Sequence, residues 1–403
     1  MYNCLGGLLL EVAVINRDAV KELLNMSNEY PVVTIIGPRQ SGKTTLAKMV
    51  FPNHKYVSVE EPDIRERAIN DPRNFLSSFS PPVIIDEIQR VPSLISYIQG
   101  VVDNGTKEGS FILTGSHQPS LNEAISQSLA GRTAILTLLP LSVKELIDSG
   151  NFLDTWDFIL KGGYPKIYDK DLKLSRFFSG YVQTYVERDV RQMLKIKDAM
   201  VFQQFIKLLA GRTGSLLNNS SLSNDIGVSS QTIKEWLSVL EASFISYRLP
   251  PFFRNISKRV VKTPKLYFQD TGLASFLLGI YSPEILSRDP LRGMLFENGV
   301  INEIIKQKNA SGSMSDLYFY RDNHGNEVDL CIESGRKLYL VEIKSSETFT
   351  SRFTKGLRCL SDILKDDVSG AYVFYNGKEK FKMDGIDVLN PFIHGIPEEI
   401  LLP

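Results

Sequence analysis

One segment near the start of the chain, "TIIGPRQSGKTT", restricts the possible folds more than any other. Gly37 and Gly42 frame four residues, and Lys43 and Thr44 follow directly, which is the spacing GxxxxGK(S/T). A run of apolar and β-branched residues precedes the segment, and a helix-compatible stretch follows it. In that context the glycines allow successive backbone N–H groups to wrap around phosphate groups at the start of a helix. The segment therefore predicts a strand, a phosphate-binding loop and a helix.

This pattern assigns a role to the residues of the loop. Lys43 would reach the β and γ phosphates of a nucleoside triphosphate, and the Thr44 hydroxyl would be a ligand of Mg²⁺. The residues expected to surround ATP are Gly37, Pro38, Arg39, Gln40, Ser41, Gly42, Lys43, Thr44 and Thr45. The alternative is a glycine-rich turn with an incidental lysine, which the flanking strand and helix disfavour.

A second strand end is expected to complete the nucleotide site. The apolar run in "VIIDEIQ" ends at Asp86, placed to hold Mg²⁺ through water, and Glu87 follows, placed to polarise an attacking water. Buried carboxylates are unfavourable unless a cation or hydrogen bonds compensate them, although capping or a surface salt bridge would also satisfy them. The polar end of "FILTGSHQ", from Thr114 to Ser116, is either a γ-phosphate sensor or an ordinary strand-to-loop turn.

Arg132, in "LAGRTAIL", precedes the next expected strand. Its guanidinium would stabilise phosphate charge, either in its own subunit or across a subunit boundary, where Arg188 is a second candidate. The alternative is an arginine on the surface or in a packing role. The sequence leaves open whether the protein is a monomer or a homo-oligomer, such as a dimer or a ring.

The 403-residue chain is too long for one ordinary hydrophobic core, so two or three domains are expected. In residues 17–155, short β-branched runs alternate with amphipathic stretches, which predicts an α/β domain with a parallel sheet covered by helices. Longer helical periodicity marks residues 156–285 as a helical region. Residues 290–403 begin with a helix and continue with strands, which predicts a second α/β domain.

Composition excludes several classes of function. The 46 basic and 46 acidic residues balance, so a nucleic-acid surface would have to be local. The 3 cysteines and 4 histidines are scattered, which argues against zinc sites and disulfides and favours a reducing compartment. The apolar stretch at the N-terminus lacks a basic leader and is interrupted by Glu11. We therefore expect a cytoplasmic protein without a membrane segment.

The middle region contains a helix-turn-helix pattern. In "SLSNDIGVSSQTIKEWLSVLEA", a short helix, a turn at Gly227 and a second helix capped by Ser229 or Ser230 are expected. The following basic and aromatic residues would suit a hairpin that contacts phosphates: Arg254, Lys258, Arg259, Lys262 and Lys265, with Phe252, Phe253, Tyr267 and Phe268. The alternative is a packing module, in which Ile233 and Trp236 belong to the core.

Three residues in two expected C-terminal strands form a candidate catalytic group. Asp329 ends "GNEVD", and Glu342 and Lys344 lie two residues apart in "YLVEIK", so that both side chains leave one face. Asp329 and Glu342 can converge on Mg²⁺ or Mn²⁺, while Lys344 would position water or stabilise the charge of a cleaved phosphodiester. Glu297, in the preceding helix, is the expected fourth member. The alternatives are a solvated strand face and the same fold without cleavage.

Together these motifs resemble the AAA+-type ATPases that prokaryotes encode with a C-terminal nuclease-like domain. The likeness extends from "GPRQSGKTTLAK" and "VIIDEIQRVPSLISYIQ" to "LFENGVINEI" and "EVDLCIESGRKLYLVEIKSS". It implies a P-loop ATPase domain with an additional-strand fold, a helical and winged-helix middle, and a restriction-endonuclease-like C-terminus. Glu297, Asp329, Glu342 and Lys344 would occupy the PD-(D/E)XK positions. One departure is Val328, which stands where many such nucleases carry proline.

Two hypotheses about function follow from these residues. In the first, ATP hydrolysis by the N-terminal domain controls metal-dependent cleavage of nucleic acid by the C-terminal domain. In the second, the protein is a nucleotide-driven switch that recognises nucleic acid or a partner without cutting it. Both hypotheses share the ATP site, and DNA is the favoured nucleic acid in both.

Overall fold

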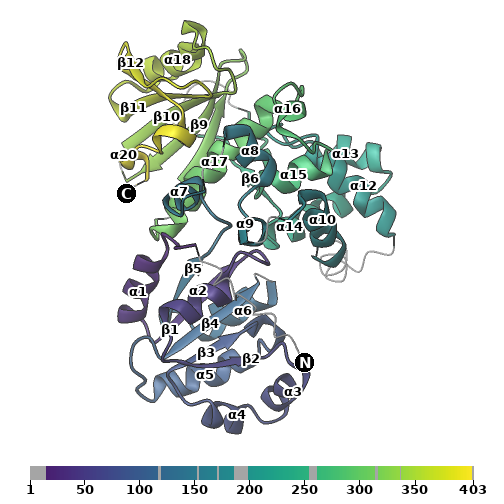
Figure 1. Cartoon of the computed structure of the whole chain (residues 1–403), viewed down its shortest axis with the longest axis vertical. Helices are drawn as coiled ribbons and strands as arrows, with labels where there is room; N and C mark the ends of the chain where they lie inside the picture. The colour runs from purple at the N-terminus through teal and green to yellow at the C-terminus, as the bar shows by residue number, and fades with distance from the viewer. Residues whose placement is uncertain are drawn as a thin grey trace, which may run out of the picture.

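The computed structural model describes residues 15–116, 119–151, 154–169, 172–185, 198–253, 261–313, 316–335 and 337–401. Figure 1 shows a sheet from the N-terminal part of the chain at the bottom, the middle helices on the right and a second sheet at the top. The long helix α17 (Arg292–Ala310) lies where these parts meet.

The N-terminal part is built on a parallel sheet of five strands in the order β2-β3-β4-β1-β5. The strands are β1 (Val32–Gly37), β2 (Lys55–Ser58), β3 (Val83–Asp86), β4 (Phe111–Ser116) and β5 (Thr133–Thr137). The helices are α1 (Val20–Glu29), α2 (Lys43–Val50), α3 (Pro62–Asn70), α4 (Pro72–Ser78), α5 (Leu94–Asp103) and α6 (Pro119–Ser128). The alternation of strands and helices thus produces the predicted α/β domain.

Both faces of this sheet are buried, which explains the uninterrupted apolar runs of its central strands. Val32 and Ile36 of β1 pack into one hydrophobic cluster with Phe111 of β4. Val33 and Ile35, which point to the opposite face, pack into another cluster. Because all the strands are parallel, the carboxyl ends of β1, β3 and β4 lie at one edge, where open α/β sheets bind ligands.

The middle region is mainly helical. Its helices are α7 (Val143–Asp148), α8 (Thr155–Lys161), α9 (Pro165–Asp169), α10 (Leu174–Tyr181), α12 (Ala199–Ala210), α13 (Asn219–Ile226), α14 (Ser230–Ala242), α15 (Thr271–Leu277) and α16 (Pro283–Leu286). Gly227 ends α13 in a left-handed conformation, and Ser229 caps α14 by accepting a hydrogen bond from the Thr232 N–H at 3.0 Å. The predicted turn and cap between these two helices are confirmed.

The hairpin expected to contact phosphates is partly a core element instead. β6 (Ser246–Leu249) and β7 (Lys265–Phe268) pair antiparallel. Tyr267 and Phe268 have no exposed surface, Phe252 is 2% exposed, and Lys265 is 4% exposed. Of the two alternatives for this segment, the packing role therefore describes these four side chains. Arg254, Lys258 and Arg259 lie outside the described residues.

The C-terminal part contains a mixed sheet of six strands in the order β12-β13-β11-β10-β9-β8. The strands are β8 (Asp316–Arg321), β9 (Glu327–Ser334), β10 (Lys337–Lys344), β11 (Val368–Tyr375), β12 (Phe381–Met383) and β13 (Ile386–Leu389). The helices are α17, α18 (Lys355–Leu364), α19 (Pro391–His394) and α20 (Glu398–Leu401). Central β10 pairs antiparallel with β9 and parallel with β11.

The middle and C-terminal parts share one hydrophobic core. A single cluster of buried residues extends from Leu141 to Ile400 and includes Phe178, Trp236 and Val341. Helix α17 is central to it, because it packs against β10, α8 and α15 and also reaches β5 of the N-terminal sheet. The N-terminal sheet, by contrast, has its own hydrophobic clusters.

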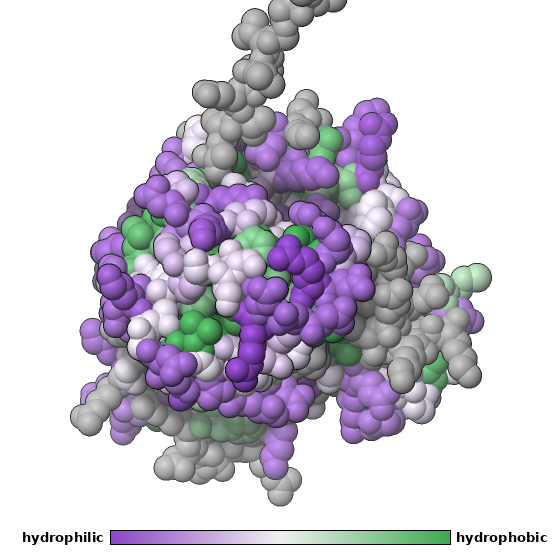
Figure 2. All heavy atoms as spheres, turned by 90° about the horizontal axis from the view of Figure 1, so that it is seen from below, coloured by the Kyte–Doolittle hydropathy of each residue, from purple (hydrophilic) through white to green (hydrophobic). Residues whose placement is uncertain are grey.

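The described surface is mostly polar at the N-terminal end of the molecule. Seen from that end, hydrophilic side chains predominate and the hydrophobic ones form small separate patches (Figure 2). Among the described residues, no helix combines the length and the apolar character needed to cross a membrane.

Candidate functional site

The loop with the GxxxxGK(S/T) spacing joins the end of β1 to the start of α2. Gly37 ends β1 so close to Leu138, the residue that follows β5, that a Cβ at Gly37 would overlap the Leu138 carbonyl oxygen. Gly42 has a φ of 93°, which glycine adopts without strain, and it immediately precedes Lys43 in the first turn of α2. The sequence thus builds the strand–loop–helix geometry that generally directs backbone N–H groups toward an anion.

Lys43 lies against the backbone of this loop. It is 6% exposed, and its Nζ donates hydrogen bonds to the carbonyl oxygens of Gly37 at 3.2 Å and Pro38 at 2.7 Å. Burial lowers the pKa of Lys43 to about 8, although Glu87 and Asp86 act in the opposite direction. A polyphosphate would favour the charged amine, so this arrangement suits an anionic ligand.

Asp86, at the end of β3, accepts hydrogen bonds from three hydroxyl groups. Thr44 Oγ1 donates to one carboxylate oxygen at 2.8 Å, Tyr56 OH donates to the other at 2.9 Å, and Thr114 Oγ1 donates as well. The structure thus brings Thr44 and Asp86 together at one edge of the sheet. A hydroxyl and a carboxylate are oxygen ligands of the kind that Mg²⁺ takes beside a nucleotide, so the residues fit that ion.

Tyr56 belongs to this site although no motif marked it. It comes from β2, which pairs with β3, so its ring reaches the Asp86 carboxylate from the neighbouring strand. Burial, together with the charge of Asp86, raises the pKa of Tyr56 above its ordinary value. The phenol therefore keeps its proton and remains a hydrogen-bond donor. The signal in the sequence that could have identified Tyr56 is a tyrosine in the strand that pairs with "VIID".

Glu87 follows Asp86 at the carboxyl edge of the sheet and contacts Gln89. Its φ of 60° is uncommon for a residue other than glycine, and Gln89 Nε2 donates a hydrogen bond to its carboxylate. Gln89 Oε1, Ser41 Oγ and Ser116 Oγ are buried without a hydrogen-bond partner in the described part of the chain. Unsatisfied buried atoms near one sheet edge are groups that a polar ligand would satisfy.

The other loop residues border the middle region. The Arg39 guanidinium lies 5.4 Å from the centre of the Tyr185 ring. Thr45 lines a small cavity of about 80 Å³ together with Met49 of α2 and Pro165 of α9. Gln40 adopts a left-handed conformation with a φ of 63°. The middle helices therefore close one side of the loop.

Arg132 does not lie near this loop. It immediately precedes β5, whose first residue, Thr133, pairs with Val32 at the beginning of β1. Parallel strands place this position at the sheet edge opposite the loop. There the Arg132 Nε atom forms an ion pair with Asp103 at 2.6 Å. The structure thus separates Arg132 from the phosphate-binding loop of its own chain, and Arg188 lies outside the described residues.

The four C-terminal candidates do come together, in what we call the charged cluster: Glu297, Asp329, Glu342, Lys344, and the additional residues Lys265 and Glu327. Lys344 Nζ lies 3.0 Å from Asp329 Oδ2 and 2.7 Å from Glu342 Oε1. Asp329 also accepts a hydrogen bond from the Ile343 N–H at 2.8 Å. Adjacent strands β9 and β10 therefore place Asp329, Glu342 and Lys344 on one face.

Glu342 is the member of the charged cluster whose negative charge is poorly compensated. It is 9% exposed, and its Oε2 atom is buried without a hydrogen-bond partner in the described residues. Burial, reinforced by the charge of Asp329, raises the pKa of Glu342 to about 8. A carboxylate oxygen left in this state would be compensated by a cation.

Lys265 is the residue that sequence reasoning misplaced. Its Nζ lies 3.0 Å from Glu297 Oε1, 2.7 Å from Glu327 Oε1 and 4.0 Å from Asp329 Oδ1. Tyr267, on the same strand, donates a hydrogen bond to Glu297. Lys265 thus neutralises the carboxylates rather than facing solvent. Within the described ranges, no group of three or more histidine, cysteine, aspartate or glutamate side chains is arranged to hold a metal ion.

Comparison with protein families divides the chain into three matched segments. Residues 29–147 match an AAA domain family (AAA_14). Residues 153–284 and 292–392 match two domains of unknown function, DUF8612 and DUF4143.

Similar proteins occur in several bacteria. The uncharacterized proteins Rv2008c of Mycobacterium tuberculosis and Mb2031c of Mycobacterium bovis are each 30% identical over 378 residues, which cover 93% of this chain and 83% of each relative. An uncharacterized protein of Haemophilus influenzae is 23% identical over 413 residues, which cover 94% of this chain and 97% of that protein. Among solved structures, the Walker-type ATPase PABY2304 of Pyrococcus abyssi matches 66% of this chain and 96% of its own, with 15% identity and a TM-score of 0.40. That score does not establish a shared fold.

Proposed function

Because the chain belongs to the same family as the mycobacterial proteins Rv2008c and Mb2031c, and because its N-terminal part is an AAA-type P-loop ATPase domain, we propose that it hydrolyses ATP with Mg²⁺. The observation that carries this proposal is the hydrogen bond between Thr44 and Asp86 beside the buried Lys43. Lys43 and Thr44 begin α2 and Asp86 ends β3, so the site forms where these two elements meet at the carboxyl edge of the parallel sheet.

Each residue of the site has a role in this proposal. Lys43 would leave the loop carbonyls and pair with the β and γ phosphates. Thr44 and Asp86 would hold Mg²⁺, which supplies charge neutralisation between the phosphates. Glu87 would orient the attacking water, and Gln89 keeps its carboxylate in place through the hydrogen bond described above. The loop from Gly37 to Thr45 would contribute the backbone N–H groups.

Three variants test the ATPase proposal. Lys43→Ala should abolish MgATP binding and turnover, whereas Glu87→Gln should bind MgATP and lose turnover. Lys21→Ala, an exposed lysine on α1, is the matched control and should behave as the wild type. The assays are ATP titration and phosphate release on each purified protein. Turnover by Lys43→Ala at the wild-type rate would contradict the proposal.

For the C-terminal part, we propose that the charged cluster acts on the phosphodiester backbone of nucleic acid in a nuclease-like fold. Glu342 Oε2 has no hydrogen-bond partner among the described residues and belongs to the same cluster as Asp329 and Lys344, which favours this proposal because a divalent cation would satisfy that oxygen. Asp329 and Glu342 would hold Mg²⁺ or Mn²⁺, and Lys344 would stabilise phosphate charge. DNA is the favoured substrate, with α13 and α14 as a winged-helix element that contacts it.

The second candidate is a nucleotide-driven switch that binds nucleic acid or a partner without cleaving it. Lys265 and Lys344 already neutralise the carboxylates of the charged cluster, and this observation favours a non-cleaving role. Incubation of the protein with DNA and RNA in Mg²⁺ or Mn²⁺ separates the two candidates. Cleavage that Glu342→Ala abolishes, while the exposed Asp362→Ala control cleaves normally, supports the nuclease; intact substrates with retained binding support the switch.

The assignment of domains and assembly is part of the same proposal. We assign residues 17–155 to the ATPase domain, 156–285 to the helical region and 290–403 to the nuclease-like domain. Arg132 is exposed enough to approach the nucleotide of a neighbouring copy, although it faces away from its own. Loss of turnover in Arg132→Ala at concentrations where the protein self-associates, measured by light scattering, would support a homo-oligomer.

A further inference from the structure

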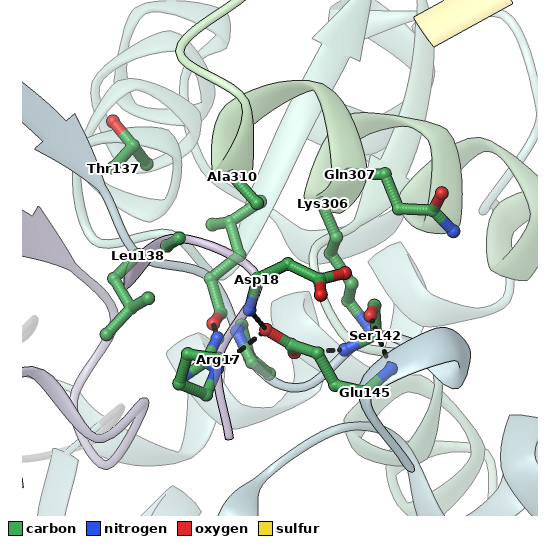
Figure 3. Close-up of a pocket in the computed structure, with 12 residues that line it drawn as sticks. Arg17, Asp18, Thr137, Leu138, Ser142, Glu145, Lys306, Gln307 and Ala310 are labelled. Carbon is green, nitrogen blue, oxygen red and sulfur yellow. Dashed lines mark hydrogen bonds and ion pairs between the residues drawn. The ribbon is translucent and has the colours of Figure 1, made fainter. Parts of the chain in front are cut away.

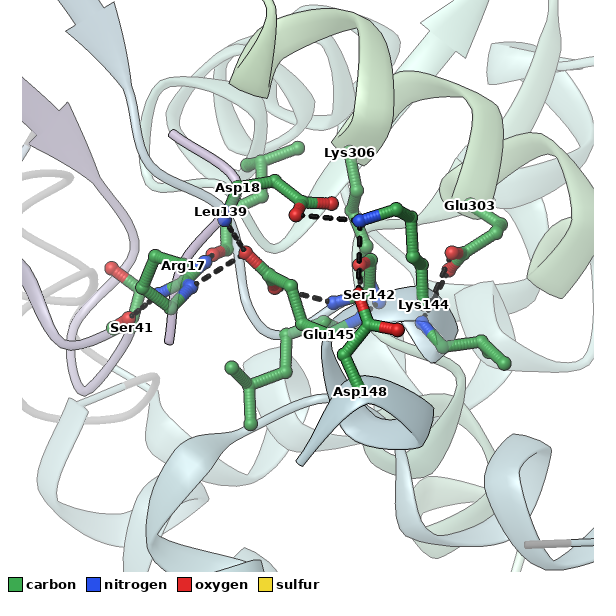
Figure 4. Close-up of polar contacts among 12 residues, drawn as sticks. Arg17, Asp18, Ser41, Leu139, Ser142, Lys144, Glu145, Asp148, Glu303 and Lys306 are labelled. Atoms are coloured by element: carbon green, nitrogen blue, oxygen red, sulfur yellow. Dashed lines mark hydrogen bonds and ion pairs between the residues drawn. The ribbon is translucent and has the colours of Figure 1, made fainter. Parts of the chain in front are cut away.

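Arg17 connects the phosphate-binding loop to the segment that follows β5. Its Nη1 atom donates a hydrogen bond to the carbonyl oxygen of Ser41 at 2.8 Å, and Nη2 donates to the carbonyl oxygen of Leu139 at 2.6 Å. Its Nε atom donates to Glu145 Oε1 at 2.9 Å. Figure 4 shows these contacts meeting at one guanidinium, and the Arg17 side chain is only 8% exposed. All three bonds come from one planar group, which fixes its orientation.

The contact with Ser41 has a direct consequence for the loop. A trans peptide unit points its carbonyl oxygen and the following N–H in opposite directions. When Arg17 holds the Ser41 carbonyl on its own side, the Gly42 N–H must point away from Arg17. Gly42 lies at the start of α2, where N–H groups face a bound phosphate, and Arg17 Nη1 lies 3.7 Å from the position that a Gly42 Cβ would take. Arg17 therefore orients an amide that would bind phosphate.

The segment that Arg17 grips is held from its other side by α17. Lys306 Nζ donates a hydrogen bond to the Leu141 carbonyl at 2.9 Å, and both carboxylate oxygens of Glu303 accept from the Val143 N–H at 3.0 Å. Figure 3 shows Arg17 and Glu145 on one side of a pocket that Lys306 and Gln307 of α17 line on the other. Residues 139–145 are thus clamped between Arg17 and α17.

The groups that hold residues 139–145 against α17 are buried, and their burial restricts the position of α17. Glu303 is 1% exposed and Lys306 is 6% exposed, and burial raises the pKa of Glu303 and lowers that of Lys306. Buried groups of this kind are tolerated only when their hydrogen bonds are made, so the clamp favours one seating of α17 over slightly shifted ones. The same helix carries Glu297 of the charged cluster nine residues before Lys306, which is about 14 Å away along the helix axis.

We propose that Arg17 is a positioning residue of the nucleotide site and that α17 holds it in place, so that ATP affinity depends on how α17 is seated. This inference rests on the proposed binding of ATP at the loop. It deepens that proposal by naming the route through which the C-terminal domain and the nucleotide influence each other: α17, residues 139–145, Arg17 and the Ser41 peptide. By linkage, ATP must in turn favour the seated position of α17.

A double-mutant cycle of MgATP affinity tests the inference. Arg17→Lys keeps the positive charge but loses the planar group, and it should raise the Kd for MgATP about tenfold, as expected for one charge-assisted hydrogen bond. Saturating kcat should change less than about threefold, because the orientation of the loop acts on phosphate binding. Lys306→Met, which cannot touch the nucleotide, should also raise the Kd. The double variant should raise it by less than the product of the two single effects.

Lys144→Met is the matched control, because Lys144 lies in the same clamp segment on α7 but pairs with Asp18 and Asp148 at the surface. Its Kd should equal that of the wild type. An unchanged Kd in Arg17→Lys or in Lys306→Met, or additive effects in the double variant, would overturn the inference. If wild-type protein fails to bind MgATP at all, the proposed function itself falls, which is a different result from a wild type that binds and variants that bind equally well.

Hydrogen exchange of the wild type keeps the inference testable if a variant does not fold. MgATP should slow exchange in residues 139–145 and in the turn of α17 that contains Glu303 and Lys306. Protection confined to residues 37–45 would overturn the inference.

Discussion

Affinity for MgATP should fall as the pH rises above 8. Burial lowers the pKa of Lys43 to about 8 in the ligand-free protein, whereas an amine paired with polyphosphate keeps its proton to a much higher pH. As the pH rises past 8, the bound form therefore holds more protons than the free form, and the difference approaches one proton. Raising the pH favours the form with fewer protons, so it favours release of the nucleotide.

The size of this effect follows from the same pKa. If only the charged amine binds the phosphates, the Kd should rise about twofold by pH 8, about tenfold by pH 9 and about 30-fold by pH 9.5. The slope approaches about 1.4 kcal/mol per pH unit, and below pH 7 Lys43 should contribute no pH dependence.

Titration of a fluorescent ATP analogue with Mg²⁺, at constant ionic strength between pH 7 and 9.5, measures the effect. Calorimetry at pH 8.5 in two buffers with different heats of ionisation should show proton uptake on binding. Glu342→Gln is the control, because burial also raises the pKa of Glu342 to about 8. A Kd constant within about twofold across the range, or a pH dependence that disappears in Glu342→Gln, would refute the role of Lys43.

Three further predictions follow from single contacts. Gly37→Ala should lower the free energy of unfolding, measured by urea titration, by about 2–3 kcal/mol, because the added Cβ would overlap a backbone carbonyl. Gly100→Ala in α5 is the control: its Cβ would meet no atom of the described residues within 4 Å, so the free energy of unfolding should stay unchanged or rise by about 0.5–1 kcal/mol. Tyr56→Phe should cost about 1 kcal/mol in the same assay, since it removes one of the donors to Asp86; stability equal to the wild type would show that this hydrogen bond contributes nothing. Glu342→Gln should change the pH dependence of stability. In the folded wild type Glu342 keeps a proton that the unfolded chain loses between about pH 4.5 and 8, so the wild type should lose stability more steeply than the variant as the pH rises through that window, by at most about 1.4 kcal/mol per unit. Parallel curves for the two proteins would contradict that assignment.

The parts of the fold that the sequence predicted are those fixed by local rules. The apolar runs that end at Gly37 and Asp86 are short and are separated by helical stretches, so a parallel sheet with both ends at one edge was the expected arrangement. Asp329 and Glu342 lie in strands joined by a short turn, and alternation alone places Glu342 and Lys344 on one face.

Other contacts depend on packing between distant segments and have no local signature. Lys265 meets Glu297 and Glu327 only because β7 packs against α17 and β9, and a lysine in a basic stretch gives no hint of burial. Arg17 donates a hydrogen bond to the Ser41 carbonyl, and the residues around either position give no sign of that contact. The expectation that Arg132 reaches the phosphates of its own chain depended on which end of β5 it occupied, and the parallel register decides that question.

The continuous apolar interior from Leu141 to Ile400 determines how this protein can be dissected. Separating the second and third matched segments by proteolysis or truncation would leave both fragments with a large apolar face in water, because each supplies part of the other's interior. The fragments should therefore aggregate, whereas residues 141–401 should melt as a single cooperative unit. Studies of the C-terminal chemistry should accordingly retain the helical region.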